Sequence, residues 1–368
     1  MAPQSQTLSL TTLISSTFPN VKEEFADAVF KNSALLGKMW LNGRKDIEDG
    51  GHQIQRTVEV GTNETVGAYE GYEVLDDTPQ DPLTDVWERW AEIAGTVTVS
   101  AREEAANRGK ARIRNQTQAK LENLRKSMTE TINGYILNPG ATAWAADAPA
   151  ASGKAPVPLT TILSLALNTC HNMSASTYSV WDNQRKLSGS SNNAGGGGSF
   201  AHTAFKNEWR NFYNTCSKSN EGRPDLILTG QEAAETYEAS LEGQVRYAGG
   251  NGLASLGFDG NVMLGRAEVC WDEVCPGTAA NPGSSPAQTD WVDYSTKAEE
   301  VAFFINTDYL KWVAMQGRDM TLSEFFDARV NNQTAKKAIL EIEGQLMCTN
   351  RRVMGVFYGI DTNAVTFS

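Results

Sequence analysis

The chain has 368 residues, with hydrophobic residues at 40%, charged residues at 21% and a formal net charge of −12. These are ordinary values for a globular protein, and the length favours two domains, or one domain with projecting arms, over a single compact core. The net negative charge argues against a protein whose main function is to bind the phosphate backbone of nucleic acids, because nucleic-acid-binding domains usually carry net basic charge or a broad basic stripe.

Residues 1–48 predict an N-terminal arm. Most of them are polar, and a helix-like apolar pattern is found only between Phe25 and Trp40. We therefore expect an extended segment that carries one short helix.

Residues 49–99 predict a long β-hairpin, an extended loop. Ile54, Val58 and Val60 share one parity of a strand, and the segment from Trp87 to Val99 alternates in the same way. The residues between these strands include several Gly and Pro. Because an isolated two-stranded ribbon is only marginally stable in water, we expect a second copy of the chain to hold this one.

The predicted hairpin is strongly acidic, since Arg89 is the only base between positions 59 and 92. An acidic ribbon is often only a solvated surface. Here we expect contacts between subunits, and the acidic candidates are Glu64, Glu70, Glu73, Asp76, Asp77 and Asp81.

A long helix of opposite charge follows the hairpin. Ser100 and Glu103 have the spacing of a capping box, apolar residues recur from Leu121 to Tyr135, and Gly134 with Pro139 predicts the end. A helix of about 33 residues would be about 50 Å long. Its basic residues could pair with the acidic hairpin of another copy, and the candidates are Arg108, Lys110, Arg112 and Arg114.

The rest of the chain mixes strands and helices without regular alternation. A loop rich in Ala, Pro and Gly spans 139–158, and a helix is expected to begin at Leu159. A helix around Trp209, a buried strand over Pro224–Thr229 followed by a helix, and later strands within 262–269, 301–313, 338–346 and 353–358 complete the pattern. The expected fold class is α+β.

A survey for chemistry finds little. His52, His171 and His202 form no zinc-hydrolase motif, and neither Cys170–His171 nor Cys270 with Cys275 has metal-ligand spacing. The acidic residues between Asp76 and Asp85 lack the glycine and glutamate of a calcium loop. We expect no catalytic residues, no metal and no cofactor. The cysteines are odd in number and the start lacks signal-peptide features, so we expect synthesis in a reducing cytoplasm.

The order of these elements resembles the major capsid proteins of tailed bacteriophages, which have the Hong-Kong-97-type fold. Val66–Tyr72 with Asp76–Asp81 resembles the tip of the extended loop in that family, and Trp90–Ser100 resembles the strand that leads to its spine helix. Pro224–Thr229 resembles a strand of the axial domain. Phe303–Leu310 and Cys348–Arg352 resemble later segments that return through the peripheral domain.

The resemblance implies an arm at 1–48, an extended loop at 49–99, a peripheral domain with the spine helix at 100–158 and 311–353, and an axial domain at 159–310 and 354–368. It also implies a non-enzymatic shell subunit of a virion, which forms pentamers and hexamers around a double-stranded DNA genome. The implied partners are copies of itself, a scaffolding protein, a portal and a decoration protein. Some relatives cross-link through lysine and asparagine side chains; no such pair can be assigned here, so we expect noncovalent closure. The net negative charge predicts only weak contact with packaged DNA, and no apolar run is long enough to predict a membrane span.

Two alternatives stay open at this point. A cellular, encapsulin-like compartment would use the same fold around an enzyme cargo. A soluble hydrolase with a catalytic triad assembled in space would leave no local motif. Electron microscopy of assembled particles would separate the cellular compartment from the phage head, because a portal vertex and packaged DNA favour the phage. A stable monomer with hydrolase activity would favour the second alternative.

Overall fold

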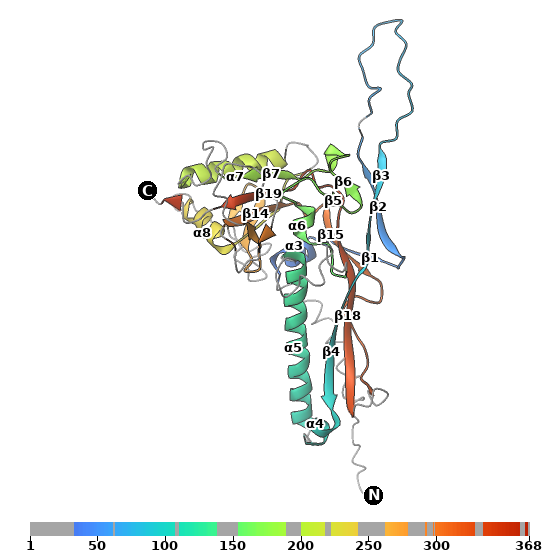
Figure 1. Ribbon diagram of the computed structural model, residues 1–368, viewed down its shortest axis with the longest axis vertical. Coiled ribbons are helices and arrows are strands. Elements are labelled where there is room, and N and C mark those ends of the chain that lie inside the picture. Colours follow the sequence, from blue (N-terminus) through green and yellow to red (C-terminus); the bar gives the residue numbers. More distant parts are fainter. Residues whose placement is uncertain are drawn as a thin grey trace.

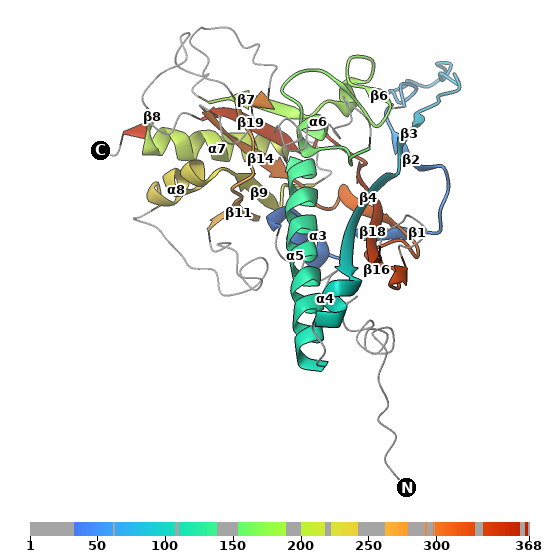
Figure 2. The ribbon, with the colours of Figure 1, turned by 60° about the horizontal axis from the view of Figure 1, so that its bottom comes forward.

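A computed structural model describes residues 33–61, 63–106, 110–137, 154–188, 200–217, 222–241, 262–278, 291–292, 297, 299–327, 334–360 and 365–366. Figures 1 and 2 show a body of sheet and helices, from which a long helix extends in one direction. In Figure 1 a hairpin with a long loop projects in the other direction. The ends of the hairpin and of the long helix therefore mark the two ends of the long axis.

Two sheets form the framework of the described residues. The first sheet has six strands: β1 (Lys45–Glu48), β4 (Ala91–Ser100), β15 (Leu310–Met315), β16 (Thr321–Leu322), β17 (Phe326–Asp327) and β18 (Ala335–Cys348). The second has eight: β7 (Gln184–Leu187), β9 (Leu226–Thr229), β10 (Met263–Leu264), β11 (Ala267–Trp271), β12 (Gly277–Thr278), β13 (Trp291–Val292), β14 (Glu299–Ile305) and β19 (Gly355–Ile360).

In the second sheet β14 is a central strand, because it pairs with β9, β12 and β19. From Glu300 to Ile305 every residue is buried, which explains why the sequence of β14 is an apolar run without alternation. The helices α7 (His202–Cys216) and α8 (Gln231–Ala239) contribute aromatic residues to a core cluster shared with this sheet, in which Trp209 stacks on Tyr237 at 4.9 Å between ring centroids.

In the first sheet the long strand β18 connects the other strands. It pairs with β4 over its first part, from Ala335 to Gly344, and with β15 over its last part, from Gly344 to Cys348. At Gly344 a Cβ would lie 2.7 Å from Cζ2 of Trp312. A side chain larger than hydrogen at this position would therefore push the indole away from β18.

The hairpin of the sequence analysis is shorter than expected. The strands β2 (Gln53–Glu59) and β3 (Leu83–Arg89) pair with each other along their full lengths. The chain then turns away at Trp90, and β4 pairs with β18 instead of continuing the hairpin. The alternation of buried and exposed side chains also changes parity at this turn. Val86 in β3 is buried at an even position, whereas Ala91, Val97 and Val99 in β4 are buried at odd positions. The two-residue alternation within β4 was predicted correctly. The prediction that β4 continues the hairpin was wrong, because β4 pairs with β18.

The long helix is present as α4 (Ala101–Ala106) and α5 (Lys110–Leu137). The capping box is confirmed, because the Glu103 N–H donates to Ser100 Oγ and the Ser100 N–H donates to Glu103 Oε2, both at 3.1 Å. Gly134 lies inside α5 and does not end it. Met128 and Ile132 are buried, and a Cβ on Gly95 of β4 would lie 2.5 Å from Cδ1 of Leu124, so helix and strand approach closely.

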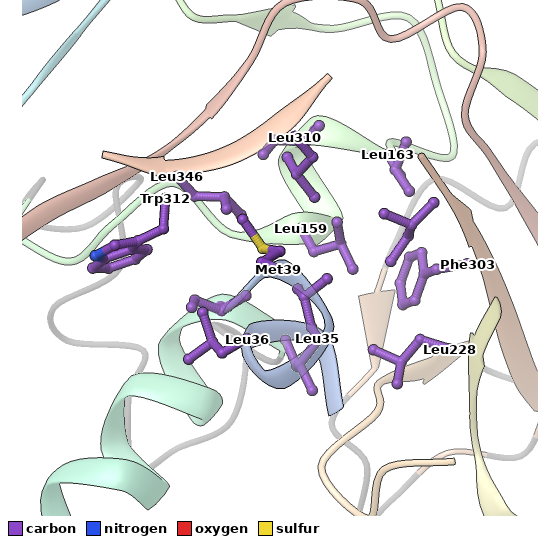
Figure 3. Close-up of a cluster of buried hydrophobic side chains, with 14 of the residues drawn as sticks. Leu35, Leu36, Met39, Leu159, Leu163, Leu228, Phe303, Leu310, Trp312 and Leu346 are labelled. Atoms are coloured by element: carbon purple, nitrogen blue, oxygen red, sulfur yellow. The ribbon is translucent and has the colours of Figure 1, made fainter. Parts of the chain in front are cut away.

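Figure 3 shows the core where the two sheets meet. Leu35, Leu36 and Met39 of α3 (Ala34–Leu41) point into one cluster with residues of both sheets. The other labelled members are Leu159, Leu163, Leu228, Phe303, Leu310, Trp312 and Leu346. The short helix expected at the end of the arm therefore packs as part of the body, and β1 after it pairs in parallel with β15.

The helix expected from Leu159 is a single turn, α6 (Leu159–Ile162), and Leu167 beyond it is 59% exposed. The remaining short elements are β5 (Thr169–Cys170), β6 (Met173–Ser174), the 3-10 helix η1 (Ser179–Trp181), β8 (Phe200–Ala201) and β20 (Val365–Thr366). The Gly-rich loop near 195 and most of the excursion at 276–295 lie outside the described residues.

Candidate assembly interface

The loop between β2 and β3, here called the ribbon tip (residues 63–82), projects from the body (Figure 1). No strand pairing occurs within it, and local turns shape the backbone. Thr65 donates its N–H and hydroxyl to Asn63 Oδ1, and Thr78 does the same to Asp76 Oδ1. The bonds from the Thr78 hydroxyl and the Thr78 N–H lower the pKa of Asp76.

All six acidic candidates, from Glu64 to Asp81, lie in the ribbon tip and are exposed. The large apolar residues beside them are exposed as well, with Tyr72 at 105% and Val74 at 97%. Val66, Tyr69 and Leu75 are each more than 60% exposed. An apolar set of this kind on a projecting segment is typical of a surface that a partner covers.

The base of the ribbon behaves differently. Ile54 and Val58 of β2 and Val86 of β3 are buried in a cluster of the chain's own body. The other buried members of this cluster are Met173, Trp181, Val313 and Met347. The expectation that another copy must hold the whole ribbon is therefore wrong for the base, because the chain itself provides the apolar surface.

Polar contacts also fix the base. His171 lies in a tight turn between β5 and β6, where His171 and Asn172 have φ of +49° and +61°, as in the turns that two-residue hairpins favour. The Cys348 N–H donates to His171 Nε2 at 3.1 Å, and Nδ1 lies 3.4 Å from Glu88 Oε2. Since a backbone N–H can only donate, Nε2 is the acceptor and the ring proton is on Nδ1, facing Glu88.

The basic candidates lie at the far end of the molecule from the ribbon tip. Lys110, Arg112 and Arg114 are in the first turns of α5, and Arg108 falls outside the described residues. Figure 1 shows α4 and the start of α5 at the end of the long axis opposite to the ribbon tip. One chain cannot bring the two charged sets together, so their pairing requires two copies and stays a prediction.

The candidate ligand clusters of the sequence analysis are not assembled into a site. Both ring nitrogens of His171 are engaged as described above, and the five cysteines are buried thiols. Asp85 accepts from Gln55 and Thr57, so it belongs to the ribbon base. Among the described residues no three His, Cys, Asp or Glu side chains are grouped to hold a metal ion. None of the helices described is both long and apolar enough to span a bilayer.

Comparison of the sequence with models of known families and with curated proteins finds no match. The structure, however, is similar to solved capsid subunits. A chain of the cyanophage A-1(L) capsid aligns with a TM-score of 0.63 at 14% identity, over 89% of this chain and 92% of that chain. A chain of the mature capsid of bacteriophage PhiM1 aligns with a TM-score of 0.51 at 8% identity, over 89% and 87%.

The chain has the Hong-Kong-97-type fold. The resemblance to tailed-phage capsid proteins and the α+β class are thereby confirmed at the level of the fold. A further structure, the SrpI encapsulin complex of Synechococcus elongatus PCC 7942, aligns with a TM-score of 0.47 at 9% identity, over 90% of both chains.

For this Hong-Kong-97-type chain, the sequence analysis proposed the acidic residues of the ribbon tip as contacts, which stays a prediction, and did not propose the exposed apolar residues beside them. Tyr69, Tyr72, Val74 and Leu75 were not among the candidates, although they interrupt a segment otherwise rich in Gly, Pro and Asp. Such residues in a turn-rich segment were the available signal, because turns exposed to solvent rarely need large apolar side chains.

Proposed function

We propose that this chain is the major shell subunit of a tailed-phage head, assembling through pentamers and hexamers into an icosahedral capsid around double-stranded DNA. The observation that carries the proposal is the ribbon tip of a Hong-Kong-97-type chain, whose Tyr72 and Val74 are almost fully exposed. A protein that worked alone would expose these residues to water at all times. A shell subunit covers them with the next copy.

Burial of the apolar side chains of the tip favours assembly of many copies. Burying a large apolar side chain stabilises by about 1.5–3 kcal/mol. A tip that buries several of them on a neighbour therefore contributes a useful free energy at each contact, after the cost of immobilising the subunit. A closed shell repeats the contact at every subunit.

Complementary charge can set the orientation of this contact between subunits. The ribbon tip carries only carboxylates among its charged side chains, and the start of α5 is basic. We propose that the tip of one copy lies against Lys110, Arg112 and Arg114 of another, because complementary charge selects orientation and partner. Arg108, two positions before Lys110 in the sequence, belongs to the same proposed basic set. The net charge of −12 supports only weak contact with packaged DNA.

We propose the same domain bounds as the resemblance implies. The peripheral domain, at 100–158 and 311–353, holds the long helix and the strands from β15 to β18, and the axial domain, at 159–310 and 354–368, holds the second sheet with α7 and α8. The extended loop, at 49–99, holds β2, β3 and most of β4. A scaffolding protein, a portal and a decoration protein are the proposed further partners, and the virion is the proposed location. The protein needs no catalytic residue for this role.

The test is assembly of the purified full chain. Gradient centrifugation and electron microscopy should show closed shells, and a variant with residues 66–80 replaced by a Gly-Ser segment of equal length should yield folded but unassembled subunits. A stable, active monomer from the unaltered chain would contradict the proposal. In particles taken from their natural source, a portal vertex and DNA support the phage head, whereas an enzyme cargo without a portal would identify a cellular compartment.

A further inference from the structure

Three arginines converge on one pocket beside the second sheet. Arg210 lies on α7, Arg223 precedes β9, and Arg266 lies in the turn between β10 and β11. The pocket has a volume of about 340 Å³, and its other lining residues are Tyr213, Asn214, Leu264 and Gly265. Because the three arginines come from separate segments of the chain, only the folded structure brings them together.

Buried residues and one backbone hydrogen bond support this arginine pocket. Tyr213 and Leu264 are buried, and the turn of Gly265 closes directly onto the Tyr213 ring. Gly265 has φ of +66°, and a Cβ there would lie 3.0 Å from Cε1 of Tyr213. The Arg266 N–H donates to the Tyr213 hydroxyl at 3.3 Å. The turn that carries Arg266 is therefore held in place by the residue beneath it.

Among the residues that the structure describes, no carboxylate lines the arginine pocket or balances its charges. Elsewhere the described arginines often have acidic partners, as Arg56 has Glu48 and Arg318 has Glu343. Within the described residues, Arg210, Arg223 and Arg266 form no such ion pair. The chain as a whole has more acidic than basic residues, so a cluster of three arginines is unusual in it. The three positive charges at the rim of this pocket repel each other, and a bound anion would offset the repulsion.

We propose that the arginine pocket binds a phosphate group. A guanidinium presents its donors as a planar fork, and phosphate offers several oxygens in different directions, so forks from three elements can each engage it. A carboxylate offers two oxygens in one plane and suits one or two forks. Another pocket, beside η1, differs because Asp182 in its lining already pairs with Arg185. The phosphate can belong to a nucleic-acid strand or to a small free compound.

Equilibrium dialysis of the full chain with radiolabelled inorganic phosphate tests the proposal. We expect saturable binding, and Arg223→Ala and Arg266→Ala should each weaken it about tenfold, because each variant removes charge-assisted hydrogen bonds to the phosphate. The matched control is Arg89→Ala, an exposed arginine on β3. Unchanged melting temperatures would show that all variants fold. Absence of saturable binding, or an equal loss in the control, would overturn the proposal.

A second binding experiment identifies the source of the phosphate. If the source is nucleic acid, a single-stranded oligothymidylate should bind more tightly than inorganic phosphate, and each pocket variant should reduce the salt slope of its binding by about one. If the oligonucleotide binds no more tightly than inorganic phosphate, the pocket serves a free phosphate compound. Displacement of phosphate by poly-glutamate at lower concentration than by pyrophosphate would contradict a phosphate pocket. Particle formation, followed in parallel, reports separately on the shell function.

Discussion

Arg351 is fully buried, and its guanidinium is held by neutral acceptors. Its Nε donates to the Ile162 carbonyl at 2.6 Å, and its Nη2 donates to Asn168 Oδ1 at 2.8 Å and to Asn183 Oδ1 at 3.1 Å. One side chain thus joins the turn after β18 to α6 and to the segments on either side of η1.

Replacing Arg351 should cost more than its length suggests. Arg351→Met leaves the buried acceptors without a donor, and we expect a loss of about 3 kcal/mol in the free energy of unfolding. Arg352→Met is the control, because Arg352 is exposed and should cost less than about 0.5 kcal/mol. Urea denaturation of unassembled subunits measures both. Equal midpoints for the two variants would show that the guanidinium contributes no net stability.

The sequence alone did not indicate that Arg351 is buried. Its segment was recognised by resemblance, but the acceptors come from positions about 170 to 190 residues away along the chain. A local pattern carries no information about partners at that distance. The same reason explains the pocket formed by Arg210, Arg223 and Arg266, and the turn that places His171 against Glu88. In contrast, the acidic residues of the ribbon tip lie within one short segment of the sequence, so the charge of the tip could be predicted from the sequence alone.

Among the elements, those whose stability is local were predicted best. The capping box at Ser100 and Glu103 depends on residues three apart, and its hydrogen bonds are confirmed. The alternation of β4 was also clear, yet its pairing with β18 was not, because register is decided between segments more than 200 residues apart. The buried strand β9 with α8 was predicted within a few residues.

Removal of the helix cap tests that local stability. Ser100→Ala should lower the free energy of unfolding by about 1 kcal/mol, because the Glu103 N–H loses its acceptor. The hydrogen bond from Lys120 first, and that from the Ser100 N–H second, lower the pKa of Glu103. The stability that Glu103 contributes is therefore present above its unfolded pKa and is lost as the pH falls through the lowered value. Both proteins should lose this contribution at acidic pH, because the bonds of the Glu103 carboxylate to Lys120 and to the Ser100 N–H are present in both. The difference between the two denaturation curves comes mainly from the Ser100 hydroxyl and should therefore persist at acidic pH.

The two parts of the ribbon should respond differently to truncation. Val86→Ala removes buried methyl groups from the base and should cost about 1–3 kcal/mol in the unfolding free energy of the isolated chain. Tyr72→Ser should change that free energy by less than about 0.5 kcal/mol, because the side chain contacts solvent only. A large loss for Tyr72→Ser in the unassembled chain would mean that the tip folds against its own body.

At the scale of the whole molecule, the exposed apolar tip should matter only for assembly. Tyr69→Ser with Tyr72→Ser removes apolar surface that we expect a neighbour to cover, so the concentration of subunits needed for shells should rise at least tenfold. Leu167→Ser is the matched control, since Leu167 is also exposed but belongs to the segment between α6 and β5 and not to the ribbon tip. Light scattering against subunit concentration measures the threshold. Equal shifts for both variants would show that general surface hydrophobicity, and not the tip, sets assembly.

The elongated shape makes the charge arrangement testable across molecules. Figure 1 places the ribbon tip and the start of α5 at opposite ends, so a change at one end acts on the other only through a second copy. Arg112→Glu with Arg114→Glu should leave the subunit folded and suppress shell formation, because like charges then meet at the contact. Adding Asp76→Lys with Asp77→Lys should restore shells by reversing the second partner. High salt should weaken assembly of the unaltered chain and relieve part of the defect of the Glu variant, because it screens both interactions. Failure of the fourfold variant to regain shells, with both double variants folded, would separate the tip from α5 and assign its partner elsewhere on the neighbouring subunit.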